Sequence, residues 1–240
     1  MDGRTLAATI VRVLSAGAVQ AMVEAIGDEF SRATGQTLDL NFAPVGTLRA
    51  RLQAGERADL VIMSVSAIDV LEKTGAFRSG SRVELGRTVT GVAIADGAPL
   101  PDISTVEAFK QTLLEARAVS YSDPKVGGSS GVFFAGLLDR LGIADEVNRK
   151  SVLKNRGHEV AEAVASGEAD IGTTFVSEIL TVKGAQVAGP LPGELHNTNA
   201  YAGAVPTGSR APELAAAFLR ALADPATRAR WTAAGLEPAF

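Results

Sequence analysis

The sequence predicts an α/β protein of two lobes, in which each lobe holds a mostly parallel sheet flanked by helices and two crossing strands form the hinge. Its 240 residues are 46% hydrophobic and 21% charged, which is enough apolar material for one large core or two small ones. Aromatic residues make up only 5%, while Ala, Val and Leu abound, as in helices packed on strands that are apolar on both faces. Strands, short loops and helices also alternate along the chain, which is typical of parallel sheets.

The first three strand–loop–helix units lie between residues 9 and 77. Runs of β-branched and apolar residues favour the strands, and apolar positions spaced like those of Val19, Met22 and Ile26 favour the helices. Because such units wind with right-handed crossovers, ligands are expected beyond the carboxyl ends of the strands. The predicted strands are 9–15, 37–42 and 58–63, and the helices begin at Val19, Leu48 and Ser64 and end at Gly35, Gly55 and Gly75.

The pattern changes after Gly86, where TVTGVAIA, residues 88–95, forms a strand that contains a glycine. This strand is the predicted crossing into a second lobe, and a strand at 198–205 is predicted to return beside it. Lobe 1 is therefore expected to span residues 1–84 and 205–240, and lobe 2 residues 85–204. Within lobe 2 the predicted helices are 105–115, 132–141 and 160–165 and the strands 118–121, 169–175 and 185–188; the tail adds helices 212–222 and 225–234, each with Pro near its first turn.

Composition excludes several classes of function. The net charge is −4 without any run of Lys or Arg, so nucleic-acid binding is disfavoured. Cysteine is absent, which removes disulfides, thiolate metal sites and cysteine nucleophiles. The two histidines, His158 and His196, lack the spacing of zinc ligands, and no glycine-rich loop fits a nucleotide. We therefore expect neither a metal ion nor a cofactor.

The N-terminal segment predicts the location of the protein. It has no basic stretch followed by a long apolar run, and no run approaches the length of a membrane span. As written, the sequence predicts a soluble cytoplasmic protein, or a periplasmic one if a signal peptide has been removed ahead of Met1. Neither membrane insertion nor an apolar association stripe is indicated, so a monomer is expected.

Four loops at predicted strand ends are rich in Gly, Ser or Thr. Helix N-termini expose unpaired N–H groups and a partial positive charge, so a small anion is a natural partner, and hydroxyls add further donors. Any one loop is more commonly an ordinary helix cap or tight turn, but all four fall at the same end of their strands. They therefore predict one anion site. The four loops are Ser15-Ala16-Gly17-Ala18, Val45-Gly46-Thr47, residues 127–131 and Thr173-Thr174.

Arg156 and His158 stand near a fifth loop and could reach the same ligand. The guanidinium of Arg156 has a planar fork that matches carboxylates and oxyanions. The alternatives are a solvated charge for Arg156, within a basic stretch, and a surface or capping role for His158. His196, in the predicted return hinge, is interpreted as a surface or capping residue.

The order of these pieces resembles the molybdate-binding solute receptors of ABC importers, a branch of the type II periplasmic binding proteins. The resemblance covers nearly the whole chain, and TLRARLQAGERADLVIMS is its most specific stretch. It implies a two-lobed receptor fold, a small anionic ligand and the membrane subunit of an ABC importer as partner. Carried over by position, it implies ligand contacts at Ala18, Gly46, Ser130, Gly157 with its neighbour Arg156, and Phe175.

This sequence departs from the pattern of molybdate receptors at three of those positions. Two serines of the family appear here as Ala18 and Gly46, and a tyrosine as Phe175, so three hydroxyl donors are lost. Each lost donor costs a dehydrated oxyanion about 1–3 kcal/mol, which disfavours molybdate and tungstate. The gain of Arg156, His158 and Ser129 favours a larger organic anion, such as a carboxylate.

A second hypothesis is enzymatic, and the sequence leaves open which one holds. Aconitate isomerase, which shifts a double bond within a tricarboxylate, is similar to molybdate receptors in fold. A 1,3 proton shift needs a base beside the carbon acid and partners for the carboxylates. Under this hypothesis His158 is the base, and Arg156 with Ser129 and Ser130 holds the substrate. Under both, the expected ligand-binding residues are Ser15, Gly17, Ala18, Gly46, Thr47, Ser129, Ser130, Arg156, Gly157, Thr174 and Phe175.

Overall fold

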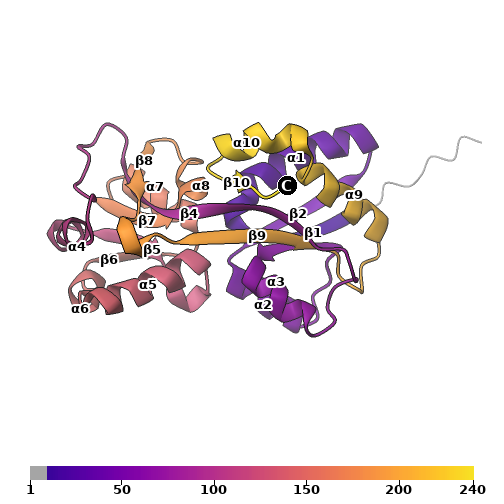
Figure 1. Ribbon diagram of the computed structural model, residues 1–240, viewed down its shortest axis with the longest axis horizontal. Coiled ribbons are helices and arrows are strands. Elements are labelled where there is room, and N and C mark those ends of the chain that lie inside the picture. The colour runs from indigo at the N-terminus through magenta and orange to yellow at the C-terminus, as the bar shows by residue number, and fades with distance from the viewer. Residues whose placement is uncertain (1–9) are drawn as a thin grey trace, which may run out of the picture.

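The computed structural model describes residues 10–240 and contains two lobes joined by long strands (Figure 1). The first strand, predicted at 9–15, begins in the structure at Ile10, and both Thr9 and Met1 lie outside the described residues. The fold class predicted from the sequence is confirmed. No helix among residues 10–240 combines the length and apolarity that crossing a membrane requires.

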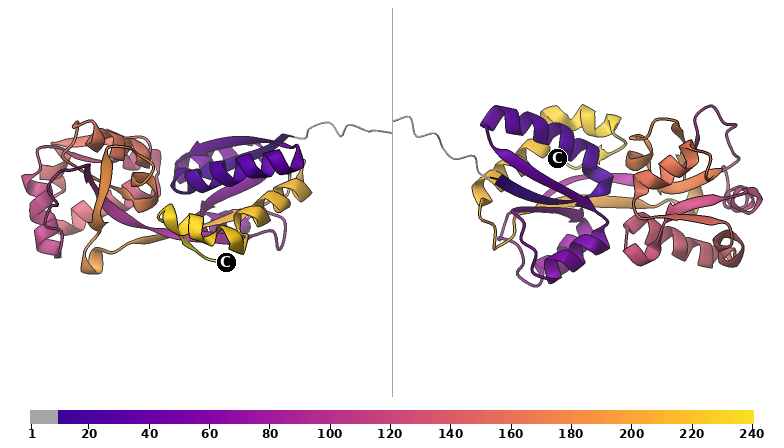
Figure 2. Two further views of the ribbon diagram at one scale, coloured as in Figure 1. Left: turned by 90° about the horizontal axis from the view of Figure 1, so that it is seen from above. Right: turned by 180° about the vertical axis from the view of Figure 1, so that it is seen from behind.

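Lobe 1 contains a parallel sheet with the strand order β2-β1-β3. The C-terminal segment packs on this lobe, and its last strand pairs with β4 (Figure 2). The strands are β1 (Ile10–Ala16), β2 (Thr37–Ala43) and β3 (Leu60–Ser64); the helices are η1 (Gly17–Val19), α1 (Gln20–Thr34), α2 (Val45–Gln53) and α3 (Val65–Glu72), and the tail adds α9 (Pro212–Leu222), η4 (Pro225–Thr227), α10 (Arg228–Ala233) and β10 (Glu237–Pro238).

Lobe 2 contains a second parallel sheet, in which β5 lies between β6 and β7. Helices cover it on both faces (Figure 1). The strands are β5 (Val119–Ser122), β6 (Ser151–Lys154), β7 (Ile171–Phe175) and β8 (Ala185–Pro190); the helices are α4 (Val106–Glu115), η2 (Pro124–Val126), α5 (Ser129–Leu141), α6 (Ala144–Asn148), α7 (Gly157–Ala165), α8 (Val176–Ile179) and η3 (Gly193–Leu195).

Two strands run between the lobes: β4 (Val83–Ala95) and β9 (Thr198–Ala204). They pair antiparallel from Val83 opposite Gly203 to Val89 opposite Thr198. The second half of β4 then pairs with β7 and β8, while β9 pairs with β3. One continuous strand therefore serves both sheets, which ties the lobes together through backbone hydrogen bonds. The proposed domain boundary between residues 84 and 85 lies within β4.

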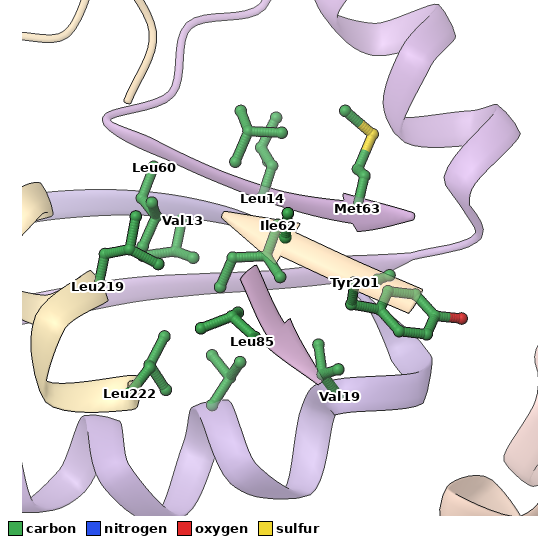
Figure 3. Close-up of a cluster of buried hydrophobic side chains, with 14 of the residues drawn as sticks. Val13, Leu14, Val19, Leu60, Ile62, Met63, Leu85, Tyr201, Leu219 and Leu222 are labelled. Atoms are coloured by element: carbon green, nitrogen blue, oxygen red, sulfur yellow. The ribbon is translucent and has the colours of Figure 1, made fainter. Parts of the chain in front are cut away.

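Each lobe has its own hydrophobic core. In lobe 1, strands β1 and β3 meet β9 and α9 through side chains such as Leu14, Ile62 and Leu219 (Figure 3). Tyr201 lies at the edge of this cluster, with its hydroxyl directed away from the apolar side chains (Figure 3). In lobe 2 the core is built around Phe109 and Phe134. Separate cores leave the contact between the lobes available for a polar site.

Three helices begin three residues before their predicted starts. Helices α2, α5 and α7 start at Val45, Ser129 and Gly157, whereas apolar periodicity begins at positions 48, 132 and 160. The first three residues of each helix include at most one large apolar side chain, so they carry no apolar pattern. The loops rich in Gly, Ser and Thr are thus partly the first turns of helices. Strand β6 was missed because its residues are partly or fully exposed and alternate weakly.

Asp59 joins three elements of lobe 1 through its buried carboxylate. One oxygen accepts a hydrogen bond from the Arg12 backbone N–H at 3.0 Å. The other accepts from the Ser209 hydroxyl and from the backbone N–H groups of Arg210 and Ala211, at 2.8, 2.8 and 3.1 Å. Burial raises the pKa of Asp59, but these hydrogen bonds outweigh it and lower the pKa below its ordinary value.

We expect Asp59→Asn to lower the free energy of unfolding by about 2 kcal/mol, because an amide cannot accept on both sides. Since the folded state holds the carboxylate with a lowered pKa, its contribution is present above pH about 4 and is lost as the pH falls further. Urea unfolding at pH 7 and pH 3 measures both effects. Asp39→Asn, which alters an exposed ion pair with Arg12, is the matched control and should cost under about 1 kcal/mol. Equal losses in the two variants would contradict the role of Asp59.

Candidate functional site

A pocket lies between the lobes at the carboxyl ends of five strands, the position where open α/β sheets bind ligands. Lobe 1 contributes the segments after β1 and β2, lobe 2 contributes those after β5, β6 and β7, and β9 contributes Tyr201. The lining residues are Ala16, Gly17, Ala18, Gln20, Phe42, Ala43, Pro44, Val45, Ser122, Gly128, Ser129, Ser130, Asn155, Arg156, Gly157, His158, Phe175, Glu178 and Tyr201.

Most of the residues expected from the sequence line this pocket. They come from both lobes and from loops that are far apart in the chain. Those that line it are Gly17, Ala18, Ser129, Ser130, Arg156, Gly157, His158 and Phe175. Ser15 is buried outside the lining, and its hydroxyl donates to the Ala16 carbonyl at 3.2 Å. Thr174 is also buried, and its hydroxyl donates to the Glu178 carboxyl at 2.6 Å.

Gly46 and Thr47 lie where the two lobes touch. The Gly46 N–H donates to the Gly127 carbonyl at 3.0 Å, and the Thr47 hydroxyl donates to the Val126 carbonyl at 3.4 Å. A Cβ on Gly46 would lie 2.8 Å from the Cα of Gly127, so only glycine permits this approach. The pocket behind this contact has a volume of about 40 Å³, which is room for a few water molecules. A larger ligand therefore enters only when the lobes move apart.

The wall formed by lobe 2 is rich in hydrogen-bond donors. Ser122 and Ser130 are buried, and no described residue pairs with the Ser122 hydroxyl. The thirteen-residue helix α5 begins at Ser129, so its free N–H groups and positive end lie at the pocket. Arg156 adds a guanidinium that makes no ion pair within the part of the chain that the structure describes. This wall can bind a carboxylate or another oxyanion.

An aromatic wall faces the donors. Phe175 and Tyr201 meet edge to face, with ring centroids 6.3 Å apart. Burial, reinforced by the nearby Glu178, raises the pKa of Tyr201, so its phenol stays neutral and can donate a hydrogen bond. The Tyr201 hydroxyl, on strand β9, can thus replace the hydroxyl that is lost where Phe175 stands in place of the family's tyrosine. Sequence analysis missed Tyr201 because an aromatic residue in a strand is an ordinary core residue.

Glu178 is the second site residue that sequence analysis missed. It lies in the first turn of α8, directly after β7, and is buried although it carries an ionisable group. Burial raises the pKa of Glu178 to about 7. Hydrogen bonds from the Thr174 hydroxyl and the Phe175 N–H act in the opposite direction, but they are weaker than the effect of burial. In the sequence it resembles any glutamate at a helix start. A buried carboxyl group with a near-neutral pKa is a common feature of active sites.

No metal site is formed by the residues that the structure describes. In residues 10–240, no group of three His, Asp or Glu side chains is placed to hold a metal ion. The pocket is instead equipped for anion binding by donors and for proton transfer by His158 and Glu178.

Comparisons with known proteins agree with this geometry. Residues 11–237 match the family model described as bacterial extracellular solute-binding protein. An aconitate isomerase from Pseudomonas sp. is 35% identical over 239 residues, which cover 96% of this chain and 88% of the relative. Among solved structures, the periplasmic molybdate-binding protein of Azotobacter vinelandii matches with a TM-score of 0.71 at 19% identity, covering 94% of this chain and 98% of that one. A sulfate-binding protein of Mycobacterium tuberculosis matches with a TM-score of 0.74 at 17% identity, covering 96% and 87%. The chain therefore belongs to the bacterial extracellular solute-binding protein family.

Proposed function

We propose that this protein binds a small organic polycarboxylate between its lobes and isomerises it by moving a proton across a three-carbon unit. One observation carries the proposal. A single pocket contains the donor-rich wall with Arg156 and two side chains that can transfer protons, His158 and Glu178. A binding site for a bare oxyanion has no use for a buried carboxyl group such as Glu178, whose pKa is raised to about 7 by burial. The similarity to an aconitate isomerase along 96% of the chain supports the same conclusion.

The proposed reaction needs no cofactor. A base takes a proton from the CH₂ group next to a carboxylate, and the electron pair of that C–H bond spreads over the double bond and its carboxylate. A proton then adds to the far carbon of the three-carbon unit, and the double bond has moved by one position. Donors held around the carboxylates stabilise the charge that develops in this intermediate. The donor-rich wall of lobe 2 would supply them.

A second candidate is a receptor that only binds an organic anion and delivers it to the membrane subunit of an ABC importer. Membership of a solute-binding family favours this role. The family is described as extracellular, so we propose a location outside the cytoplasm for either function. The two candidates share the pocket and differ only in whether the bound anion is converted.

One experiment separates the candidates. The melting temperature is measured with molybdate, sulfate, citrate, cis-aconitate and trans-aconitate, because any ligand of the native state raises it. We expect the tricarboxylates to stabilise the protein and the inorganic anions to leave it unchanged. The protein is then incubated with cis-aconitate in heavy water, and proton NMR follows deuterium uptake and isomer formation. Stabilisation by tricarboxylates without uptake or conversion would favour the receptor, and stabilisation by molybdate alone would contradict both.

We expect Arg156→Ala to weaken trans-aconitate binding by about 10- to 100-fold, which corresponds to about 1.5–3 kcal/mol for a charge-assisted hydrogen bond. Isothermal titration calorimetry measures the change. The matched control is Arg149→Ala, which removes a guanidinium at the end of α6 that donates to the Asp145 carbonyl, away from the pocket. Similar losses in the two variants would mean that Arg156 acts only through the overall charge of lobe 2.

A further inference from the structure

We propose that the Glu178 carboxylate, and not the His158 imidazole, takes the proton from the ligand carbon and returns it two carbons away. This inference rests on the proposed isomerase function and assigns its base. The sequence points to His158, because histidine is the usual proton-transfer group near neutral pH. The contacts of the two side chains favour Glu178.

The Glu178 carboxyl group lies against glycines from both lobes. A Cβ on Gly157, at the start of α7, would collide with this carboxyl group, and a Cβ on Gly17 in lobe 1 would lie 3.4 Å from Oε1. Thr174, four residues earlier in strand β7, donates its hydroxyl to Oε2 at 2.6 Å. The carboxyl group is thus held in one place where the lobes meet, as a base must be to reach a specific carbon.

No cation neutralises this carboxyl group. Within residues 10–240 no Lys, Arg or His forms an ion pair with Glu178. A buried glutamate that served only structure would normally be paired, because an unpaired buried charge is costly. Burial raises the pKa of Glu178 to about 7, so the group both accepts and releases a proton near neutral pH. These are the properties of a general base.

Glu178 also has a route to solvent. A groove of about 730 Å³ runs outside the pocket between α1 and the α7–α8 region, and Glu178 lines both. We call it the outer groove; its lining residues are Gly17, Gln20, Ala21, Glu24, Ala25, Asp28, His158, Glu162, Glu178, Thr181, Val182 and Lys183. A base at this junction can lose its proton to water, and so reach its carboxylate form, before a turnover begins.

His158 lacks comparable support. It also lines both cavities, but it is half-buried, and no described residue fixes its ring by a hydrogen bond or an ion pair. An imidazole that acts as a base is generally oriented by a partner on its other nitrogen. His158 is thus placed to bind a carboxylate of the ligand and would affect KM more than kcat.

Atoms and electrons balance in this step. The Glu178 carboxylate forms an O–H bond as the C–H bond of the CH₂ group breaks, and the electron pair moves into the conjugated carboxylate system. The O–H bond then breaks as the pair returns to form a C–H bond at the far carbon. The base ends as the carboxylate with which it began, and the step needs no redox partner.

The test compares Glu178→Gln with His158→Gln, using cis-aconitate as substrate and Glu168→Gln as control. Glu168 is exposed and pairs with Lys154, away from the pocket. We expect Glu178→Gln to lower kcat by about 10³-fold, within the range for loss of a general base. His158→Gln should lower kcat less than tenfold and raise KM, and Glu168→Gln should match the wild type. A loss of kcat in His158→Gln with turnover retained in Glu178→Gln would overturn this inference while leaving the isomerase function standing.

A second readout does not depend on turnover. An ionised Glu178 repels a bound carboxylate, so the affinity for trans-aconitate should fall about tenfold between pH 6 and pH 8 in the wild type and much less in Glu178→Gln. The other titratable or charged groups that line the two cavities with Glu178 are Tyr201 on β9, Arg156 before α7, His158 and Glu162 on α7, Glu24 and Asp28 on α1, and Lys183 beyond α8, and both proteins contain all of them. Equal pH dependence in the two proteins would mean that Glu178 does not face the ligand and would overturn the inference. If this readout succeeds while the wild type neither converts cis-aconitate nor exchanges its protons, the isomerase function fails and so does the role of Glu178 as its base.

Discussion

The free energy of unfolding should fall by about 3 kcal/mol as the pH rises from about 5 to about 8, and Glu178→Gln should remove this fall. Burial raises the pKa of Glu178 from 4.5 to about 7. The folded state therefore binds the proton more tightly than the unfolded chain does. This stabilisation is complete below pH about 4.5 and is lost as the pH rises through about 7, and 2.5 pKa units correspond to about 3 kcal/mol.

Urea unfolding of both proteins at several pH values measures this difference. The amide introduced by Glu178→Gln keeps the shape of the carboxyl group and still accepts from Thr174, so the variant should be more stable than the wild type at pH 8 and similar at pH 5. Because all other titrating groups are shared, subtracting the two curves isolates Glu178. Parallel curves would contradict the raised pKa. A variant that gains stability and loses turnover would show that the protein retains a costly buried acid for its chemistry.

The second large effect is expected at Gly157. A Cβ at this position would collide with the Glu178 carboxyl group, so Gly157→Ala should lower the free energy of unfolding by about 3 kcal/mol through overpacking. In a Glu178→Ala background the obstacle is gone, and the same substitution should cost less than about 1 kcal/mol. The coupling of about 2 kcal/mol between the two positions is the quantity that a double-mutant cycle measures.

Gly136→Ala is the control for this cycle. Gly136 lies in α5, and a Cβ there would meet no atom within 4 Å. Alanine is favoured over glycine within a helix, so this variant should gain up to about 1 kcal/mol in either background. A cost at Gly157 that persists without the Glu178 carboxyl group would mean that the glycine is needed for the backbone of α7 and not for the acid.

The sequence predicts the fold of this protein well because the fold depends on apolar periodicity. Strands such as 58–63 and helices such as 212–222 are buried along a regular face, and their pattern is visible without a structure. The predictions fail for segments that belong to a helix or strand but have no regular apolar pattern in the sequence. The first turns of α2, α5 and α7 contribute to the pocket, and the edge strand β6 is too exposed for a clear alternation.

The site is predicted less completely than the fold, for a different reason. Glycines, serines and Arg156 lie in loops whose composition indicates anion binding. Glu178 and Tyr201 belong to regular elements and acquire their properties only from burial at the contact between the lobes. Burial is the main cause of the raised pKa of Glu178, and this burial exists only once the chain has folded. Local sequence patterns contain no record of it.

The contact between Gly46 and Gly127 has a kinetic consequence. A hydrogen bond joins these two backbones between the lobes, next to the pocket-lining residues Val45 and Gly128. Because an anion larger than the pocket enters only when the lobes part, the rate at which this bond breaks sets a ceiling on association however concentrated the ligand becomes. The same bond delays escape, so residence time and capture rate are governed by one pair of glycines that need not touch the ligand.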